Sequence, residues 1–184
     1  VIMRYYPSCR LIIMIGLLNS VNAAIDQPVR ICAIRISFEE DYLASTTGNG
    51  KFLLEDQGLD CGSYSIDPTP HDKDYFQSQI VSLDSYFRSV SYGQFGVDLE
   101  GSDVYPHGKN ESYQLEMTMN HYNPYSQIDI QELRLTELFR DALEISHEQD
   151  QIDFSAYDLV VIFHAGIGQD FSLPFLDPTP EDIP

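Results

Sequence analysis

Residues 159–163 restrict the fold of this chain more than any other segment, because all five of them are apolar (Leu-Val-Val-Ile-Phe). A strand with one face in solvent alternates apolar and polar residues, whereas a strand covered on both faces does not. The run lies between Asp158 and His164 and is shorter than a typical buried helix. It therefore predicts a central strand with a layer of structure on each face.

A second core strand is predicted near the start of the globular region. Residues 29–38 are rich in β-branched side chains, which favour extended backbone. Every second residue of this segment is apolar, which gives the strand one continuous apolar face: Cys32, Ile34, Ile36 and Phe38. Residues 95–100 also alternate and predict another strand, and residues 113–117 predict a short one.

Two amphipathic helices are predicted between these strands. The first begins where Thr69 can cap the helix and Pro70 suits its first turn, and it ends near Gly93. The second covers residues 131–147, and its apolar residues recur at helical spacing: Leu135, Leu138, Phe139, Ala142 and Leu143. Strands alternating with helices predict an α/β fold with mixed or parallel strand pairing.

The N-terminal residues have the pattern of a secretory signal peptide. Arg4 and Arg10 precede the apolar residues 11–18, and small residues follow up to Ala23, where we expect cleavage. The alternative, a transmembrane anchor, requires about 20 apolar residues, and this stretch is well short of that length. We therefore divide the chain into a signal peptide, residues 1–23, and a single domain, residues 24–184, of a secreted protein without a stable membrane anchor.

The charge balance excludes a nucleic-acid partner. The 184 residues include 10 Lys and Arg against 29 Asp and Glu, a net charge of −19. Loss of Arg4 and Arg10 with the signal peptide leaves 8 basic residues and a net charge of −21. A surface of this sign repels phosphate backbones.

Two cysteines remain once Cys9 is lost with the signal peptide. Export to an oxidising compartment makes a disulfide between Cys32 and Cys61 one interpretation. The other is that Cys32 is a small core residue of a strand and Cys61 a thiol in a loop. Neither cysteine has a CxxC partner, so a structural zinc site is not predicted.

Two histidines invite a functional interpretation. His147 and Glu148 begin like the HExxH helix of zinc peptidases, but residue 151 is Gln, so a solvated helix end is the better interpretation. His164 ends the apolar strand and precedes a glycine-rich loop, where α/β folds commonly place binding sites. The candidate cleft-lining residues are His164, Gly166, Gly168 and Gln169. The alternative is a tight turn that contains a hydrogen-bonded His164.

One further motif concerns modification rather than catalysis. Asn110-Glu111-Ser112 matches the sequon for N-linked glycosylation, whose use depends on the organism.

Four segments together resemble a known family. They are His71-Asp-Lys-Asp-Tyr-Phe76, Ser89-Val-Ser-Tyr-Gly-Gln94, the stretch from Ile152 to Gly166, and Asp177-Pro-Thr-Pro-Glu-Asp-Ile-Pro184. Their order and spacing resemble the N-terminal portion of the catalytic domain of immune inhibitor A-like secreted zinc metallopeptidases. The similarity extends over residues 28–184.

The resemblance implies a zincin-like α/β fold, with a mixed sheet and flanking helices, that is incomplete at its C-terminal end. It implies that the full-length protein uses zinc to hydrolyse peptide bonds of protein or peptide substrates. Calcium sites are a further expectation from the resemblance, and solubility is the alternative explanation of the acidity. The sequence departs from the family pattern because no HExxH occurs in it.

That departure limits what can be carried over to these residues. No catalytic residue and no metal ligand is assigned here, and we expect the zinc ligands and the catalytic glutamate downstream of this chain. The chain alone is then an inactive fragment that forms a scaffold and one wall of the cleft. The alternative function is that of a secreted, non-catalytic binding or adhesion domain with a protease-like half-fold.

Overall fold

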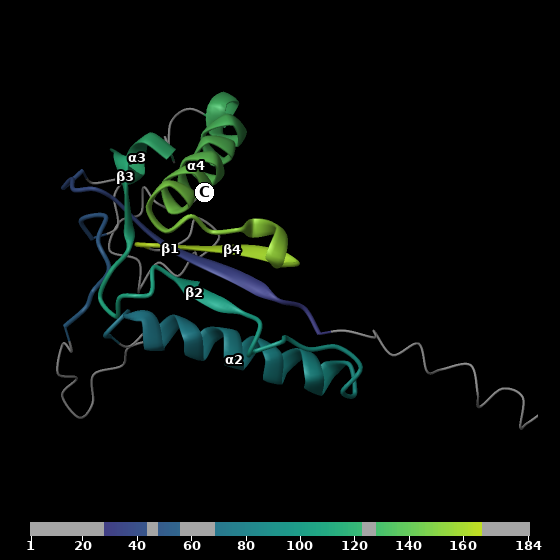
Figure 1. Cartoon of the computed structure of the whole chain (residues 1–184). Coiled ribbons are helices and arrows are strands. Elements are labelled where there is room, and N and C mark those ends of the chain that lie inside the picture. The colour runs from purple at the N-terminus through teal and green to yellow at the C-terminus, as the bar shows by residue number, and fades with distance from the viewer. Residues whose placement is uncertain (1–27, 44–47, 56–68, 123–127, 167–184) are drawn as a thin grey trace, which may run out of the picture.

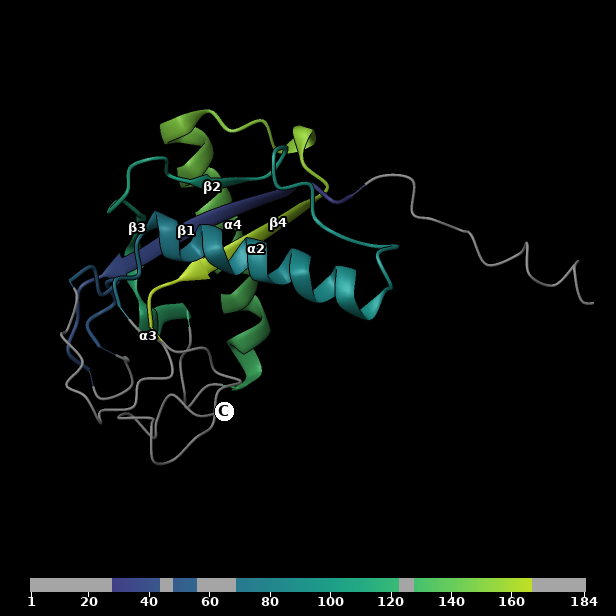
Figure 2. The same cartoon turned by 90° about the horizontal axis from the view of Figure 1, so that it is seen from below.

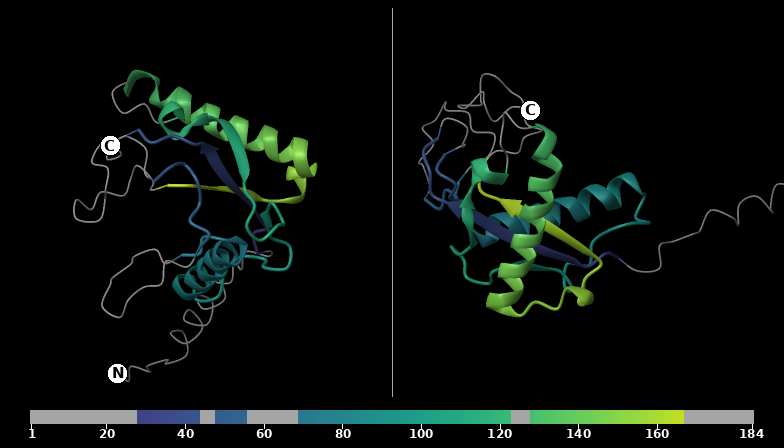
Figure 3. Two further views of the ribbon diagram at one scale, coloured as in Figure 1. Left: turned by 90° about the vertical axis from the view of Figure 1, so that its left-hand side faces the viewer. Right: turned by 90° about the horizontal axis from the view of Figure 1, so that it is seen from above.

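The computed structural model describes residues 28–43, 48–55, 69–122 and 128–166. These residues form a small open parallel sheet between two long helices, so the α/β class is confirmed (Figure 1). Figure 3 (left) shows α4 on one face of the sheet and α2 on the other. The predicted mixed sheet is not found in the described part, where every strand pair is parallel.

Strand β1 (Ile31–Glu39) is the centre of this sheet. Strand β4 (Leu159–His164) pairs with one edge of β1 over six residues. Strands β2 (Asp103–Tyr105) and β3 (Tyr113–Thr118) pair, one after the other, with its opposite edge. The predicted strand at residues 159–163 is confirmed with a layer on each face, because Val160 and Ile162 pack on the α4 side and Val161 and Phe163 on the α2 side. Its predicted central position is not found in the described chain, where β4 pairs with β1 only.

The two faces of β1 pack against different helices. The predicted apolar residues, from Cys32 to Phe38, lie in the core cluster on the α4 side, together with Ala142 of α4. Ile31 and Ala33 lie in the cluster on the other side, together with Phe76 and Ile80 of α2. β1 is therefore buried on both faces although its sequence is apolar mainly on one.

Helix α2 (Lys73–Val90) is capped three residues later than the sequence predicts, because its N-cap is Asp72 and not Thr69. The Asp72 carboxylate accepts a hydrogen bond from the backbone N–H of Tyr75 at 3.0 Å. Ser91 caps the other end, and Gly93 follows with φ 78°, as the predicted glycine stop requires.

Residues 95–100 do not form the predicted strand. Only Val97 pairs, as an isolated bridge with Val29. The Asp98 side chain accepts a hydrogen bond from Gly101 N and its carbonyl accepts one from Ser102 Oγ, so the chain turns where the strand was expected. The strand next to β1 begins only at Asp103.

The C-terminal half of the described chain follows the prediction more closely. Strand β3 continues into the short helix α3 (Met119–Tyr122), and α4 (Ile128–Asp150) extends the predicted second helix at both ends. A 3₁₀ turn, η1 (Phe154–Ala156), leads into β4. Two predicted core residues of α4 are exposed, Leu135 at 53% and Phe139 at 46%.

The side chain of Arg35 lies where one edge of β1 passes from its partner β2 to its next partner β3. It is fully buried, on the α2 face of β1. Its two terminal nitrogens donate hydrogen bonds to the carbonyl oxygens of Pro106 (2.6 Å), Gly108 (2.7 Å) and Lys109 (3.0 Å). Burial lowers the pKa of the guanidinium. A buried cation of this kind is tolerated because the three carbonyls replace its water.

Helix α2 is held to the following segment by another buried charge, Asp84. Its carboxylate accepts hydrogen bonds from Arg88 Nε at 2.8 Å and from the backbone N–H of Val97 at 2.7 Å. The Arg88 bond and then the Val97 bond hold the pKa of Asp84 below its usual value. Gly96 lies so close that a Cβ there would come within 2.7 Å of Asp84 Oδ1. Only glycine therefore fits beside this ion pair.

We predict that Arg35→Ala lowers the free energy of unfolding by about 3 kcal/mol, because three buried carbonyls lose a charged donor. Arg30 is the matched control, since its guanidinium is exposed and pairs with Asp158 at 3.0 Å. Arg30→Ala should have a much smaller effect in the same urea titration. Equal losses for the two variants would contradict the role given to Arg35.

We also predict a pH-dependent effect of Asp84→Asn. Because folding lowers the pKa of Asp84, its contribution to stability is complete above the unfolded-state pKa, about 4, and is lost as the pH falls. The variant should therefore lose about 2 kcal/mol of unfolding free energy at pH 7, and its deficit should shrink below about pH 4. A deficit that stays the same size from neutral to acidic pH would show that the carboxylate charge is not what matters.

Candidate functional site

The topology of the sheet predicts a ligand-binding site at the carboxyl ends of β1 and β4. After β1 the chain passes over one face as α2 and adds β2 and β3 on one edge. It then passes over the other face as α4 and adds β4 on the opposite edge. Crossovers that pass over opposite faces and add strands to opposite edges meet at a switch point, here the carboxyl ends of β1 and β4, where open α/β sheets bind ligands. Figure 2 shows β1 and β4 side by side beneath α2.

The predicted cleft residue His164 lies at this switch point. It is the last residue of β4 and pairs with Ile36 of β1. Ala165 N then donates to Ile36 O at 3.0 Å, which keeps the two strands together up to their ends. Gly166 follows with φ 96°, a conformation that favours glycine. Gly168 and Gln169, the other two predicted residues, lie outside the described residues.

The side chain of His164 is partly buried on the α4 face of the sheet. Its Nδ1 lies 3.1 Å from the carbonyl oxygen of Ala165, the next residue, as the alternative interpretation expects, while the rest of the predicted turn lies outside the described residues. Its ring centre lies 6.2 Å from that of Phe38, which in turn lies 5.8 Å from the ring of Tyr122. This local hydrogen bond does not prevent His164 from contacting a ligand, because its side chain is only partly buried.

The rings of His164, Phe38 and Tyr122 form a row, and polar side chains of α3 and α4 form a cluster at its Tyr122 end. Tyr122 donates to Asp141 at 2.8 Å, and burial together with this bond raises the pKa of Tyr122. Arg134 donates to Nε2 of His121 at 2.9 Å and to Glu137 at 2.6 Å. These bonds tie α3 to the first half of α4 and occupy one of the two ring nitrogens of His121.

The described residues do not supply a metal centre. No three His, Cys, Asp or Glu side chains in the described part of the chain are grouped closely enough to hold a metal ion. His147 lies exposed near the end of α4, with Nδ1 3.0 Å from the carbonyl oxygen of Ile152, as expected of a solvated helix end. Zinc therefore does not fit any set of residues described here.

Cys32 lies inside the sheet rather than at this site. It is fully buried within β1, and burial raises the pKa of its thiol to about 12. Such a thiol is a poor nucleophile. The predicted partner in a disulfide, Cys61, lies outside the described residues, so this pairing stays a prediction.

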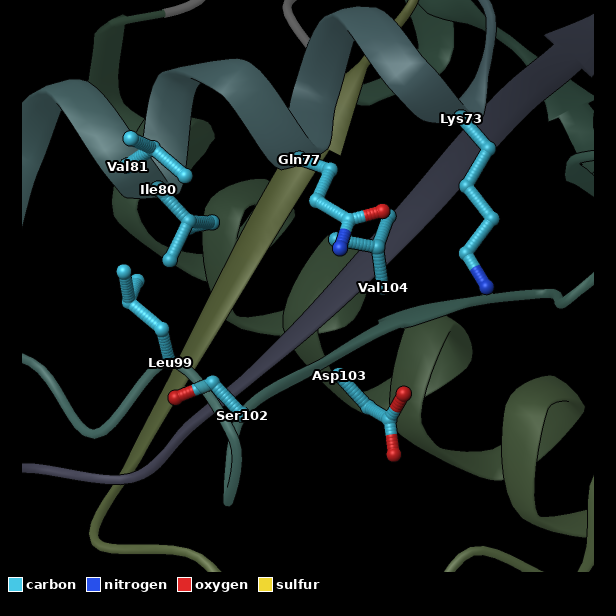
Figure 4. A pocket seen from close by; sticks show the side chains of 8 residues that line it. All are labelled: Lys73, Gln77, Ile80, Val81, Leu99, Ser102, Asp103 and Val104. Atoms are coloured by element: carbon cyan, nitrogen blue, oxygen red, sulfur yellow. The ribbon is translucent and has the colours of Figure 1, made fainter.

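A small groove lies elsewhere, between α2 and the outer edge of β2. Figure 4 shows Ile80, Val81 and Leu99 around its apolar end and Lys73 at the other end. None of the residues predicted from the sequence as cleft-lining borders it. It lies on the edge of the sheet opposite β4, so it is separate from the switch point.

Comparisons of the chain with protein families, with curated proteins and with solved structures found no match. The family resemblance therefore remains a proposal that rests on the chain's own residues. Within the described ranges, no helix has the length and apolar character needed to cross a membrane.

We predict that two neighbouring residues of the switch point respond differently to truncation. Phe38→Ala should cost about 3–5 kcal/mol of unfolding free energy, because the ring is buried in the core. His164→Ala should cost less than about 1 kcal/mol, because only a local hydrogen bond is lost at a partly exposed position. Urea titrations of both variants test this. A cost for His164→Ala that equals the cost for Phe38→Ala would make His164 a core residue instead.

Proposed function

We propose that this chain is the N-terminal part of the catalytic domain of a secreted, zinc-dependent peptidase. In this proposal it forms the scaffold and one wall of the substrate cleft. The observation that carries the proposal is the position of His164 and Gly166. These two residues of the family-like segment from Ile152 to Gly166 lie at the topological switch point of a parallel sheet, where a cleft is expected.

Uncovered apolar surface on α4 and at the edge of β4 supports the same proposal. Leu135 and Phe139 lie on the face of α4 whose later residues, Ala142 and Ser146, are buried. β4 is apolar from Leu159 to Phe163 and pairs on one edge only within the described residues. A helix stripe and a strand edge that remain uncovered together are typical of a surface that another part of a domain packs against.

The proposal assigns the metal chemistry to residues other than those described. Because no described group of side chains fits zinc, the zinc ligands and the catalytic glutamate are proposed to follow this segment in the full-length protein. The contribution of the described residues is to position the cleft wall. His164 would face substrate from the end of β4, and the Ala165–Ile36 hydrogen bond would hold that wall in place.

The decisive experiment compares two secreted proteins from the natural reading frame. One ends at Pro184 and the other continues to the natural stop codon. We expect the longer protein to contain one zinc ion per chain and to cleave casein, and the shorter one to do neither. Zinc content by mass spectrometry and peptide release measure these outcomes, and sequencing of the mature N-terminus should begin near Ala24.

Each alternative result has a definite meaning. Stoichiometric zinc and turnover in the shorter protein would contradict the division of roles proposed here. Absence of both zinc and activity in the longer protein would favour the alternative function, a secreted binding or adhesion domain. That alternative is consistent with the absence of HExxH from the 184 residues.

A further inference from the structure

The turn between β2 and β3 contains the one N-glycosylation sequon of the sequence, Asn110-Glu111-Ser112. None of the other asparagines is followed two residues later by Ser or Thr. The peptidase proposal gives this motif no role, and the turn lies on the edge of β1 opposite the switch point.

Asn110 lies at a position where a bulky group can be attached to its side chain. It is exposed, and so are its neighbours Lys109 and Glu111. Its side-chain amide has no hydrogen-bond partner in the part of the chain that the structure describes. The base of the turn is fixed, because Arg35 holds the carbonyls of Gly108 and Lys109 from below. A group on Asn110 would thus project into solvent without displacing the core.

The third residue of the sequon indicates when the modification would take place. In the folded chain Ser112 Oγ donates to Ser37 Oγ of β1 at 3.0 Å. Once β3 has paired with β1, the Ser112 hydroxyl that completes the sequon is therefore engaged in this hydrogen bond. Transfer would take place before this contact forms, on the chain as it enters the secretory pathway.

The neighbouring strand edges indicate what the group would do. Within the described residues, β2 and β3 each pair with β1 only, so their outer backbone groups are free to pair with another strand. Such edges promote association between molecules unless something blocks them. Asn110 lies just before β3 begins at Tyr113, and a large hydrated oligosaccharide there would obstruct the approach of another strand.

We propose that Asn110 carries a single N-linked oligosaccharide that shields the free edges of β2 and β3. This inference rests on the export step of the proposed function. A lipid diphosphate-linked oligosaccharide is the donor. Its sugar C1–oxygen bond breaks as a bond from C1 to Asn110 Nδ2 forms, the lipid diphosphate leaves with the electron pair, and the amide releases one proton to it.

The test is expression of the full 184-residue chain, with an added initiator methionine, in cultured insect cells. Secreted protein is treated with peptide N-glycosidase and analysed by mass spectrometry. We expect the loss of one oligosaccharide and conversion of Asn110 to Asp. Asn110→Gln should abolish the modification, whereas Ser112→Thr should retain it because the sequon is preserved. Asn49→Gln changes an asparagine outside a sequon and should leave the modification unchanged.

A second arm replaces residues 1–23 with the host's own signal peptide, which separates export from glycosylation. Glycosylation in this arm alone would support the acceptor site and would contradict the predicted signal peptide. Secreted protein with an unmodified Asn110 in either arm would overturn the acceptor site.

The shielding role has its own readout, the sedimentation of the same preparations. We expect the Asn110→Gln protein and the enzymatically stripped protein to associate at concentrations where the glycosylated protein is monomeric. Equal association of all three would overturn the shielding role.

Discussion

The hydrogen bonds of the Arg35 guanidinium are the interaction on which the rest of this structure depends. β1 has two partners in succession on one edge, and the chain leaves the sheet between them. Arg35 reaches from the middle of β1 into that gap and holds three carbonyls of the departing turn. Its burial would be costly without them. The start of α2 is bound to the same turn, because Lys73 N donates a hydrogen bond to Lys109 O at 2.8 Å.

The order of the elements around β1 also explains where a site can form. α2 and α4 cover opposite faces, and the strands that follow them lie on opposite edges. The carboxyl ends of β1 and β4 therefore lie where the crossover changes from one face of the sheet to the other. His164 lies there beside the ring of Phe38, which in turn lies beside Tyr122, so the fold offers a position for the cleft that the resemblance implies. The glycan proposed for Asn110 lies on the other edge of β1.

The sequence predicted those features that depend on local patterns. The alternation from Cys32 to Phe38 and the helical spacing around Ala142 indicated the correct faces, and the left-handed glycine after α2 was found at Gly93. The sequence also placed His164 at the end of a strand before a glycine turn. Each of these signals is contained within a short segment of about ten residues, so propensity and periodicity are sufficient to find it.

Features that depend on distant contacts could not be predicted in the same way. β4 has the more apolar sequence, yet β1 is the central strand, because only the pairing of both its edges decides this. The fully buried Arg35 occupies a position that its charge would assign to the surface. The segment at Val97 has a strand-like pattern, but the hydrogen bonds of Asp98 turn the chain. The partners of β1 and of Arg35 lie far away in sequence, whereas the turn at Asp98 is local and was hidden by the alternating pattern around it.

Amide hydrogen exchange by NMR tests the central arrangement most directly. Leu159 N donates to Arg30 O and Ala165 N to Ile36 O, so alternate amides of β4 face β1 in this parallel pair. We predict slow exchange throughout β1 and at Val161, Phe163 and Ala165. We predict fast exchange at Val160, Ile162 and His164, whose N–H groups face the edge that is unpaired within the described residues. Uniformly slow exchange along β4, or alternation along β1 instead, would contradict it.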